Sequence, residues 1–281
     1  MGKLVTILFI LFLASCQAGS PIKDYERRNK PLTFQVSEVE TGYARNALYL
    51  VKNGKKNPTV ILMHACAGVT SKSVGDLKTW KTYLMKNGFN VLAMDHLSSR
   101  GETGNNCIGR GRPVSIARLV ADVYDATAFL HGQHSVDTSK IFTLGFSMGA
   151  MTSGAAASAS MYRYHGDKKP RPRAFAGLYG GCRYGGTSYL DYDVNLPVLW
   201  LMGGKDGEAP VKSCHSVAKK LTEKGLLTYH EYPDATHCWD CFDLNGFSKT
   251  AANGVAVTYH YDHALARDSE RRVLEFFSSF K

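Results

Sequence analysis

The alternation of strand and helix patterns constrains the fold of this 281-residue chain more than any other feature of its sequence. From about residue 32, short apolar and β-branched runs alternate with amphipathic segments of helical length. Residues 59–63 (TVILM) are almost wholly apolar, which is typical of a strand buried on both faces of a sheet. The alternation therefore predicts an α/β protein with a mainly parallel sheet and helices on both faces.

The same pattern places the individual elements. We expect strands at residues 59–63, 90–94, 141–144, 174–179, 198–202 and 227–232. We expect helices at residues 72–87, 113–130, 148–158, 211–224 and 262–280. No linker interrupts this region, so residues 32–281 are predicted to form one domain. A hydrophobic content of 44% with 21% charged residues excludes the disordered, collagen-like and coiled-coil classes.

The N-terminal residues resemble a bacterial lipoprotein leader. Residues 4–13 form an apolar run of about 15 Å as a helix, half the thickness of a membrane core, which predicts a signal peptide over residues 1–15. The following Leu-Ala-Ser-Cys at 13–16 resembles a lipobox, which implies cleavage before Cys16 and diacylation of its thiol. Gln17 fits the outer-membrane sorting pattern. An ordinary cleaved signal peptide is the alternative.

Polar residues 16–31 are then expected to form a tether. These features predict a protein of the bacterial cell envelope, anchored by lipid on the periplasmic face of the outer membrane or released in the periplasm. That compartment is oxidising, so disulfides are expected.

A Gly-x-Ser-x-Gly motif at residues 145–149 lies between an expected strand and an expected helix, the context that gives this motif meaning. A side chain at Gly145 or Gly149 would crowd the sharp turn that exposes Ser147. The helix N-terminus beneath Ser147 favours a developing anion. We therefore predict Ser147 as a nucleophile, with the Met148 N–H as one oxyanion donor.

The motif also predicts the chain order serine, acid, histidine. Asp206 follows the strand at 198–202, and His237 follows the strand at 227–232. His237 would take the proton of Ser147, and Asp206 would fix its tautomer. The alternatives, each more typical of a surface or structural residue, are Glu208, Asp234, His230, His260 and His263.

The second oxyanion donor is expected from the loop after the strand at 59–63. Small residues there let backbone N–H groups face the pocket, and we favour the Cys66 N–H. His64 in the same loop is predicted to be a hydrogen-bonded structural residue.

Together these residues resemble the dienelactone hydrolase family of the α/β-hydrolase fold, from about residue 45 to the C-terminus. The matching segments are 64–68 (HACAG), 95–101 (DHLSSRG), the serine motif, 203–206 (GGKD) and 232–237 (YPDATH). The resemblance implies an eight-stranded sheet and a Ser or Cys nucleophile with Asp and His, and no cofactor or metal. Ser147 replaces the Cys of the founding enzymes, and Ala65 stands where those enzymes carry a Glu that engages the Cys. Arg100 matches a position that can hold a substrate carboxylate; a structural salt bridge is the alternative.

Six cysteines remain after Cys16, and the residues alone leave their pairing open. Resemblance to secreted members of the family implies the pairs Cys66–Cys107 and Cys182–Cys214. We expect Cys238–Cys241 to be a short local disulfide after His237. A redox C-x-x-C motif and a zinc site with His237 are the alternatives, although neither has its usual sequence context.

The net charge is +10, and residues 168, 169, 171 and 173 form a basic cluster, but no nucleic-acid-binding motif accompanies it. We interpret the charge as a solvated surface and expect no nucleic-acid partner. The predicted function is hydrolysis of a small-molecule ester or lactone. A peptidase of the same fold and a non-catalytic envelope binding protein on a hydrolase scaffold are the alternatives.

Overall fold

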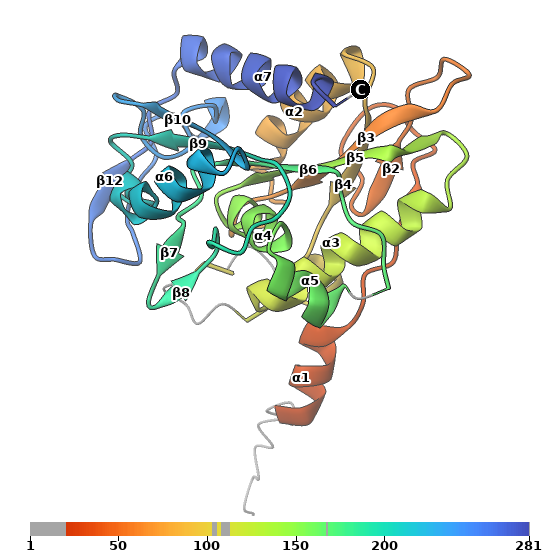
Figure 1. Cartoon of the computed structure of the whole chain (residues 1–281), viewed down its shortest axis with the longest axis horizontal. Coiled ribbons are helices and arrows are strands. Elements are labelled where there is room, and N and C mark those ends of the chain that lie inside the picture. The colour runs from red at the N-terminus through yellow and green to blue at the C-terminus, as the bar shows by residue number, and fades with distance from the viewer. Residues whose placement is uncertain (1–20, 103–105, 108–112, 167, 281) are drawn as a thin grey trace, which may run out of the picture.

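One eight-stranded sheet crosses the middle of the molecule (Figure 1). The computed structural model describes residues 21–102, 106–107, 113–166 and 168–280. The strands, in sheet order, are β1 (Gln35–Val36), β2 (Ala47–Tyr49), β4 (Asn90–Met94), β3 (Asn57–Met63), β5 (Val136–Phe146), β6 (Ala174–Leu178), β9 (Val198–Gly203) and β10 (Leu227–Tyr232). Every neighbouring pair is parallel except β2 and β4. This confirms the predicted mainly parallel sheet.

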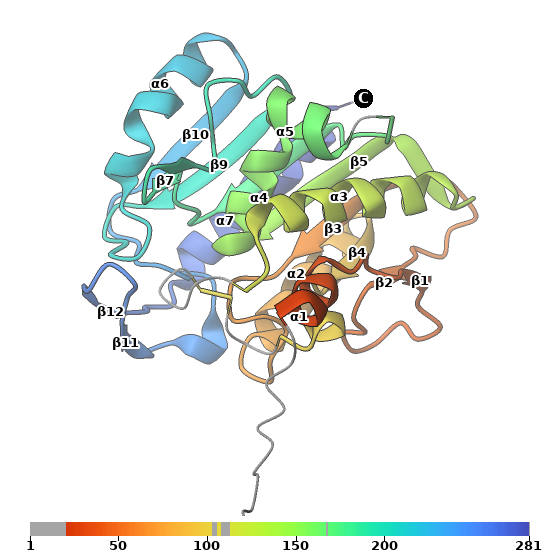
Figure 2. The ribbon, with the colours of Figure 1, turned by 90° about the horizontal axis from the view of Figure 1, so that it is seen from below.

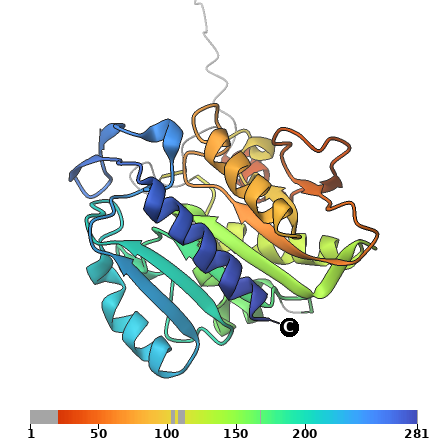
Figure 3. The ribbon, with the colours of Figure 1, turned by 90° about the horizontal axis from the view of Figure 1, so that it is seen from above.

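Helices cover both faces of the sheet, also as predicted. Helices α2 (Val74–Lys86) and α7 (His263–Ser278) lie on one face (Figure 3). The opposite face carries α3 (Ile116–His131), α4 (Met148–Ala156), α5 (Ala159–His165) and α6 (His215–Glu223) (Figure 2). The remaining elements are α1 (Pro21–Asn29) and two small hairpins, β7 (Arg183–Tyr184) with β8 (Thr187–Ser188) and β11 (Ser248–Thr250) with β12 (Ala256–Thr258).

The alternation of side chains along the central strands produces two core layers. In β3, Ile61 packs into the cluster that includes α3 and α4, while Leu62 packs into the cluster that includes α2 and α7. Trp200 of β9 is fully buried, and its ring fills the space beside Gly177 of β6. A Cβ added at Gly177 would lie 2.5 Å from that ring, so the glycine makes room for the indole.

Several element boundaries differ from the sequence predictions. Helix α3 begins at Ile116, not at 113, because the Ser115 side chain accepts a hydrogen bond from the Arg118 N–H and caps the helix. The helix predicted at 211–224 is divided into a 3-10 turn, Val211–Ser213, and α6.

The segment predicted as a tether is only partly extended chain. Residues 21–29 form α1, which contacts the short 3-10 helix η1 (Ser98–Arg100). Arg27 and Arg28 both reach the Glu102 carboxylate at 3.1 Å, and Arg27 also donates to the Arg100 carbonyl oxygen. These contacts correct the tether prediction for α1, because they attach this helix to the domain.

Residues 1–20, including the predicted signal peptide and Cys16, lie outside the described residues. Within the described part of the chain, no helix combines the length and apolar character that a membrane crossing requires.

Candidate active site

Ser147 lies at a sharp turn between β5 and α4. Its backbone has φ 51° and ψ −108°, a conformation that is rare for residues with a side chain and is held here by its surroundings. The Ser147 N–H donates to the carbonyl oxygen of Leu178 in β6 at 3.0 Å. A Cβ on Gly145 would lie 2.1 Å from the Gly149 carbonyl oxygen, so the turn requires glycine there, as the motif predicted.

Three side chains that are distant in sequence form one hydrogen-bonded chain. His237 Nε2 lies 3.2 Å from Ser147 Oγ, and His237 Nδ1 lies 2.7 Å from Asp206 Oδ2. Asp206 follows β9, His237 follows β10, and both meet Ser147 at the carboxyl ends of the parallel strands. The structure thus brings the three predicted residues together in the geometry that a serine nucleophile needs.

The surroundings of His237 support a polarised imidazole. Burial alone would lower the pKa of His237, but the charge and hydrogen bond of Asp206 outweigh it and hold this pKa above its ordinary value. Asp206 Oδ1 accepts hydrogen bonds from the Glu208 and Ala209 N–H groups at 2.8 and 2.9 Å. Asp206 is therefore fixed on both oxygens, and it orients Nδ1–H so that the Nε2 lone pair faces Ser147.

The predicted oxyanion donors come from two adjoining segments. Met148 is the first residue of α4, where backbone N–H groups lack intrahelical partners. The loop after β3 lies against this turn, since a Cβ on Gly149 would be 2.8 Å from the His64 carbonyl oxygen. In that loop, the Cys66 carbonyl accepts from the Asn106 N–H at 2.9 Å. The roles of the Cys66 and Met148 N–H groups stay predictions.

His64 is structural, as predicted. It is fully buried; Nδ1 lies 2.6 Å from the Ala65 carbonyl oxygen, and Nε2 accepts from the His96 N–H at 3.1 Å. Burial, with the nearby His96, lowers the pKa of His64 to about 4. His64 is therefore neutral at neutral pH and supports the loop.

The alternative acids have other partners. Glu208 accepts from the Tyr259 hydroxyl and pairs with Lys249 at 2.9 Å. Asp234 is mostly exposed and pairs with Lys205. Neither carboxylate takes the place of Asp206 beside His237.

Two aromatic side chains that flank His237 were missed from the sequence. The rings of Tyr179 and Tyr259 have their centroids 4.8 and 5.5 Å from the His237 ring. Tyr179 directly follows β6, so its position at a strand end beside the serine motif was an available signal. Tyr259 follows β12, a strand too short for its pattern to be read.

A comparison with protein-family models identifies the family of the chain. Residues 46–281 match the model of the dienelactone hydrolase family. The chain belongs to the dienelactone hydrolase family. Its fold is accordingly that of an α/β hydrolase. A comparison with curated proteins gave no match.

Solved structures show the same fold at low sequence identity. A Klebsiella pneumoniae protein assigned as a dienelactone hydrolase is 20% identical, with 85% of this chain and 97% of that chain covered and a TM-score of 0.59. The dienelactone hydrolase-like promiscuous phosphotriesterase P91, from metagenomic libraries, is 18% identical, with coverages of 81% and 89% and a TM-score of 0.53. A Thermogutta terrifontis esterase bound to butyrate is 12% identical, with coverages of 82% and 86% and a TM-score of 0.56.

Arg100 departs from the family expectation of a substrate-binding residue, and the structure corrects that prediction. Arg100 is fully buried, and its guanidinium donates to both oxygens of Asp122 at 2.7 and 2.8 Å. Its other N–H groups donate to the His96 carbonyl oxygen and, twice, to the Lys30 carbonyl oxygen. All five donors are used inside the protein, so Arg100 forms the structural salt bridge that was the alternative.

The three expected disulfides are present. They are Cys66–Cys107, Cys182–Cys214 and Cys238–Cys241. In the described part of the chain, the group with metal-ligand spacing is Cys238, Asp240 and Cys241, and two of its members share a disulfide. That bond leaves no thiolate for the zinc alternative.

Proposed function

We propose that this family member is a serine hydrolase that cleaves a small-molecule carboxylic ester or lactone through an acyl-enzyme on Ser147. The observation that carries the proposal is the hydrogen-bonded chain from Ser147 through His237 to Asp206. It stands at a turn that presents the hydroxyl over the N-terminus of α4.

The first half of the reaction forms the acyl-enzyme. His237 Nε2 takes the hydroxyl proton while Ser147 Oγ attacks the carbonyl carbon of the substrate. The carbonyl oxygen becomes an anion beside the Met148 and Cys66 N–H groups, and Asp206 stabilises the imidazolium that forms. The imidazolium then gives its proton to the leaving alkoxide, and the C–O bond breaks.

The second half releases the acid. His237 takes a proton from water, the resulting hydroxide attacks the acyl carbon, and the collapse of the second tetrahedral intermediate returns the proton to Ser147 Oγ. An ester yields an acid and an alcohol, whereas a lactone yields one hydroxy acid. No step calls for a metal or an organic cofactor.

Labelling with a fluorophosphonate probe tests the nucleophile. We expect the folded protein to be labelled at Ser147, and Ser147→Ala to lose both labelling and roughly 10³-fold or more of kcat on a p-nitrophenyl ester. A folded protein that resists the probe would instead favour a non-catalytic binding protein. Parallel assays with a p-nitrophenyl ester and a peptide p-nitroanilide separate an esterase from a peptidase of the same fold.

We further propose that the protein is a lipid-anchored envelope protein, acylated at Cys16. The support is the apolar run at residues 4–13 and the lipobox-like sequence that ends at Cys16. Metabolic labelling with an alkyne fatty acid should mark the wild type and not Cys16→Ser. An unlabelled wild-type protein that is cleaved and exported would support an ordinary signal peptide.

A further inference from the structure

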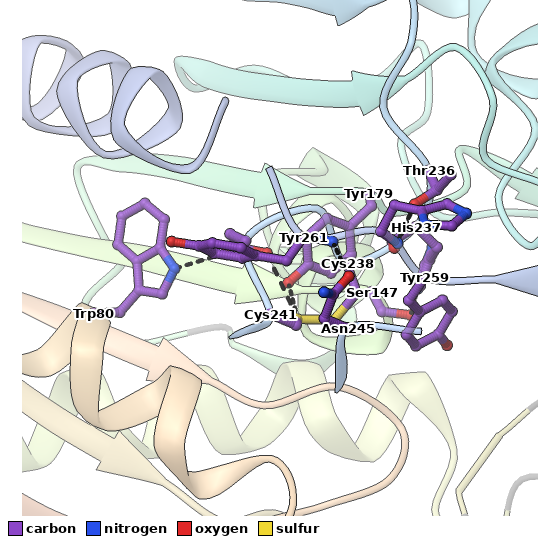
Figure 4. Close-up of a disulfide and its surroundings, with 12 residues drawn as sticks. Trp80, Ser147, Tyr179, Thr236, His237, Cys238, Cys241, Asn245, Tyr259 and Tyr261 are labelled. Carbon is purple, nitrogen blue, oxygen red and sulfur yellow. Dashed lines mark hydrogen bonds between the residues drawn. A yellow bond between two sulfur atoms is a disulfide. The ribbon is translucent and has the colours of Figure 1, made fainter. Parts of the chain in front are cut away.

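The two sides of the candidate site are supported in different ways. The His237 side is held by the Cys238–Cys241 disulfide and by the rings of Tyr179 and Tyr259, which flank the imidazole (Figure 4). The oxyanion side consists of two short segments that are far apart in sequence, the loop after β3 and the start of α4. N–H groups from these two segments can share one substrate oxygen only if the segments are fixed relative to each other.

Both predicted oxyanion donors lack a competing acceptor. Among the residues that the structure describes, the Cys66 N–H donates to no backbone carbonyl oxygen. Met148 is the first residue of α4, so its N–H has no intrahelical acceptor. Each N–H is thus available to a substrate oxygen, provided that the two residues stay side by side.

Asn106 contacts both of these residues. Its backbone N–H donates to the Cys66 carbonyl oxygen at 2.9 Å, and its Nδ2 lies 3.2 Å from Met148 Sδ. The residue is fully buried, and its amide exchanges two hydrogen bonds of 2.8 Å with the backbone N–H and carbonyl oxygen of Val114. Both amide hydrogens and the amide oxygen are therefore used. They fix Asn106 as a bridge between the loop after β3, the segment before α3 and the start of α4.

A covalent bond next to Asn106 holds Cys66 a second time. Cys107 forms a disulfide with Cys66, and their Cα atoms are 4.8 Å apart. Cys66 is therefore fixed at its carbonyl oxygen by Asn106 and at its side chain by Cys107. These two neighbouring residues thus restrain the residue of the loop whose N–H the proposed reaction uses.

We propose that Asn106 is a positioning residue for the oxyanion hole, which holds the Cys66 and Met148 N–H groups toward the same substrate oxygen. This inference rests on the proposed serine hydrolase function. Asn106 acts through these two residues and not through the imidazole of His237. Loss of its amide lets the loop move away from α4, so that one N–H no longer reaches the oxygen. The negative charge of the transition state is then less stabilised, while the neutral substrate binds as before.

The test compares Asn106→Ala with a matched control, Asn90→Ala. Asn90 is also fully buried; its Oδ1 accepts from the Val51 N–H at 2.8 Å, and its Nδ2 donates to the Ser135 carbonyl oxygen at 3.0 Å. It is the first residue of β4, so it lies at the opposite end of the parallel strands from the site.

On a p-nitrophenyl ester, we expect Asn106→Ala to lose about tenfold or more in kcat with KM changed by less than about twofold. The loss should stay below the ~10²–10³-fold that complete removal of an oxyanion donor costs. Asn90→Ala should keep the wild-type kcat. Wild-type kcat in folded Asn106→Ala, or an equal loss in Asn90→Ala, would overturn the inference.

Two further measurements separate a displaced oxyanion donor from general damage to the site. A trifluoromethyl ketone adds to Ser147 Oγ and presents an oxyanion, so its inhibition constant should rise in Asn106→Ala by about the factor by which kcat/KM falls. The pH midpoint of kcat/KM should stay at its wild-type value, because the contacts of His237 with Ser147 and Asp206 are untouched. An unchanged inhibition constant or a shifted midpoint would contradict the proposed role.

A second variant applies if Asn106→Ala does not fold. Met148→Leu conserves volume and keeps the backbone N–H but removes the sulfur acceptor of Asn106. We expect kcat and inhibitor affinity to fall together by about threefold, as for the loss of a weak hydrogen bond, and wild-type values would overturn the inference. A wild-type protein without activity, or activity retained in Ser147→Ala, would instead refute the proposed function.

Discussion

Among the residues that the structure describes, two buried His–Asp pairs share the same hydrogen bond and have different surroundings. His237 Nδ1 lies 2.7 Å from Asp206 Oδ2, and His96 Nδ1 lies 3.0 Å from Asp122 Oδ2. Both histidines follow strands of the same sheet, His237 after β10 and His96 after β4, whereas Asp122 lies in α3. The pair at His237 adjoins Ser147 and is the one that the proposed function uses, whereas the pair at His96 holds together the region where α1, η1 and α3 meet.

The difference lies in what surrounds each pair. Asp122 is shared with Arg100 and also with Arg118, which reaches its Oδ1 at 2.8 Å. Burial alone would raise the pKa of Asp122, but its hydrogen bonds with Arg100 and His96 hold this pKa below the ordinary value. His96 Nε2 is buried and has no hydrogen-bond partner among the described residues, whereas His237 Nε2 faces Ser147. A His–Asp pair can thus act as a general base only if a nucleophile lies within hydrogen-bond reach of the second imidazole nitrogen.

Replacing each histidine with glutamine should separate the two roles. This comparison has the largest expected effect. We expect His237→Gln to lose roughly 10³-fold or more in kcat, because the proton acceptor disappears, and to keep its melting temperature. His96→Gln is the matched control: it should lower the melting temperature and keep kcat per folded molecule. A folded but inactive His96→Gln would contradict the structural assignment.

Arg100→Met tests the network around the second pair. The substitution leaves the Asp122 carboxylate buried without the charge and hydrogen bonds of the guanidinium. We therefore expect a loss of about 3–5 kcal/mol in the free energy of unfolding, measured by urea titration. KM of the folded protein should not change, because no Arg100 donor faces the site. Arg28→Met removes a half-exposed ion pair and should cost under about 1 kcal/mol. A raised KM with unchanged stability in Arg100→Met would instead support a substrate-binding role for Arg100.

The pH dependence of kcat/KM sharpens the comparison at the first pair. His237 must be neutral to accept a proton, and Asp206 raises its pKa, so activity should fall as the pH is lowered through a midpoint above 6.5. Asp206→Asn removes that charge and should shift the midpoint to lower pH, with a much lower plateau. Asp234→Asn, at an exposed acid, is the control. A midpoint that stays fixed in Asp206→Asn would show that another group titrates.

The smallest effect concerns Asp76, a partly buried carboxylate in α2. Asp76 lines a cavity of about 300 Å³ with Asp240 and Asp243, and burial together with these charges raises its pKa to about 7. A raised carboxyl pKa means that the folded state binds more protons than the unfolded state above the ordinary value of 3.8, so stability falls as the pH rises from about 4 to above 7. Asp76→Asn should raise the melting temperature at pH 8 by about 3 °C and by less at pH 5. An equal gain at both pH values would contradict this cause.

Strands buried on both faces were the most predictable part of the fold. The run at 90–94 matches β4 to the residue, because a strand buried along its whole length admits few other patterns. Short strands such as β1 and β7 were missed, since two residues carry no readable period. The docking of α1 was missed because its partners lie more than seventy residues further along the chain.

The residues of the candidate site also differ in how far the sequence predicts them. Ser147, Asp206 and His237 could be located because the strand–turn–helix context fixes their order along the chain. Tyr259, whose ring lies beside His237, could not be located, because it follows a strand too short for its pattern to be read. Arg100 was misassigned by family position, which carries no information about burial.

The burial of the indoles has a spectroscopic consequence. All three tryptophans of the chain are at most 2% exposed, and each Nε1–H is hydrogen-bonded: Trp80 to Asp240, Trp200 to the Gly180 carbonyl oxygen and Trp239 to Ser269. Their emission therefore reports separately on α2, on β9 and on the contact with α7. Variants that retain one tryptophan each would reveal in which order these layers open, without any extrinsic dye.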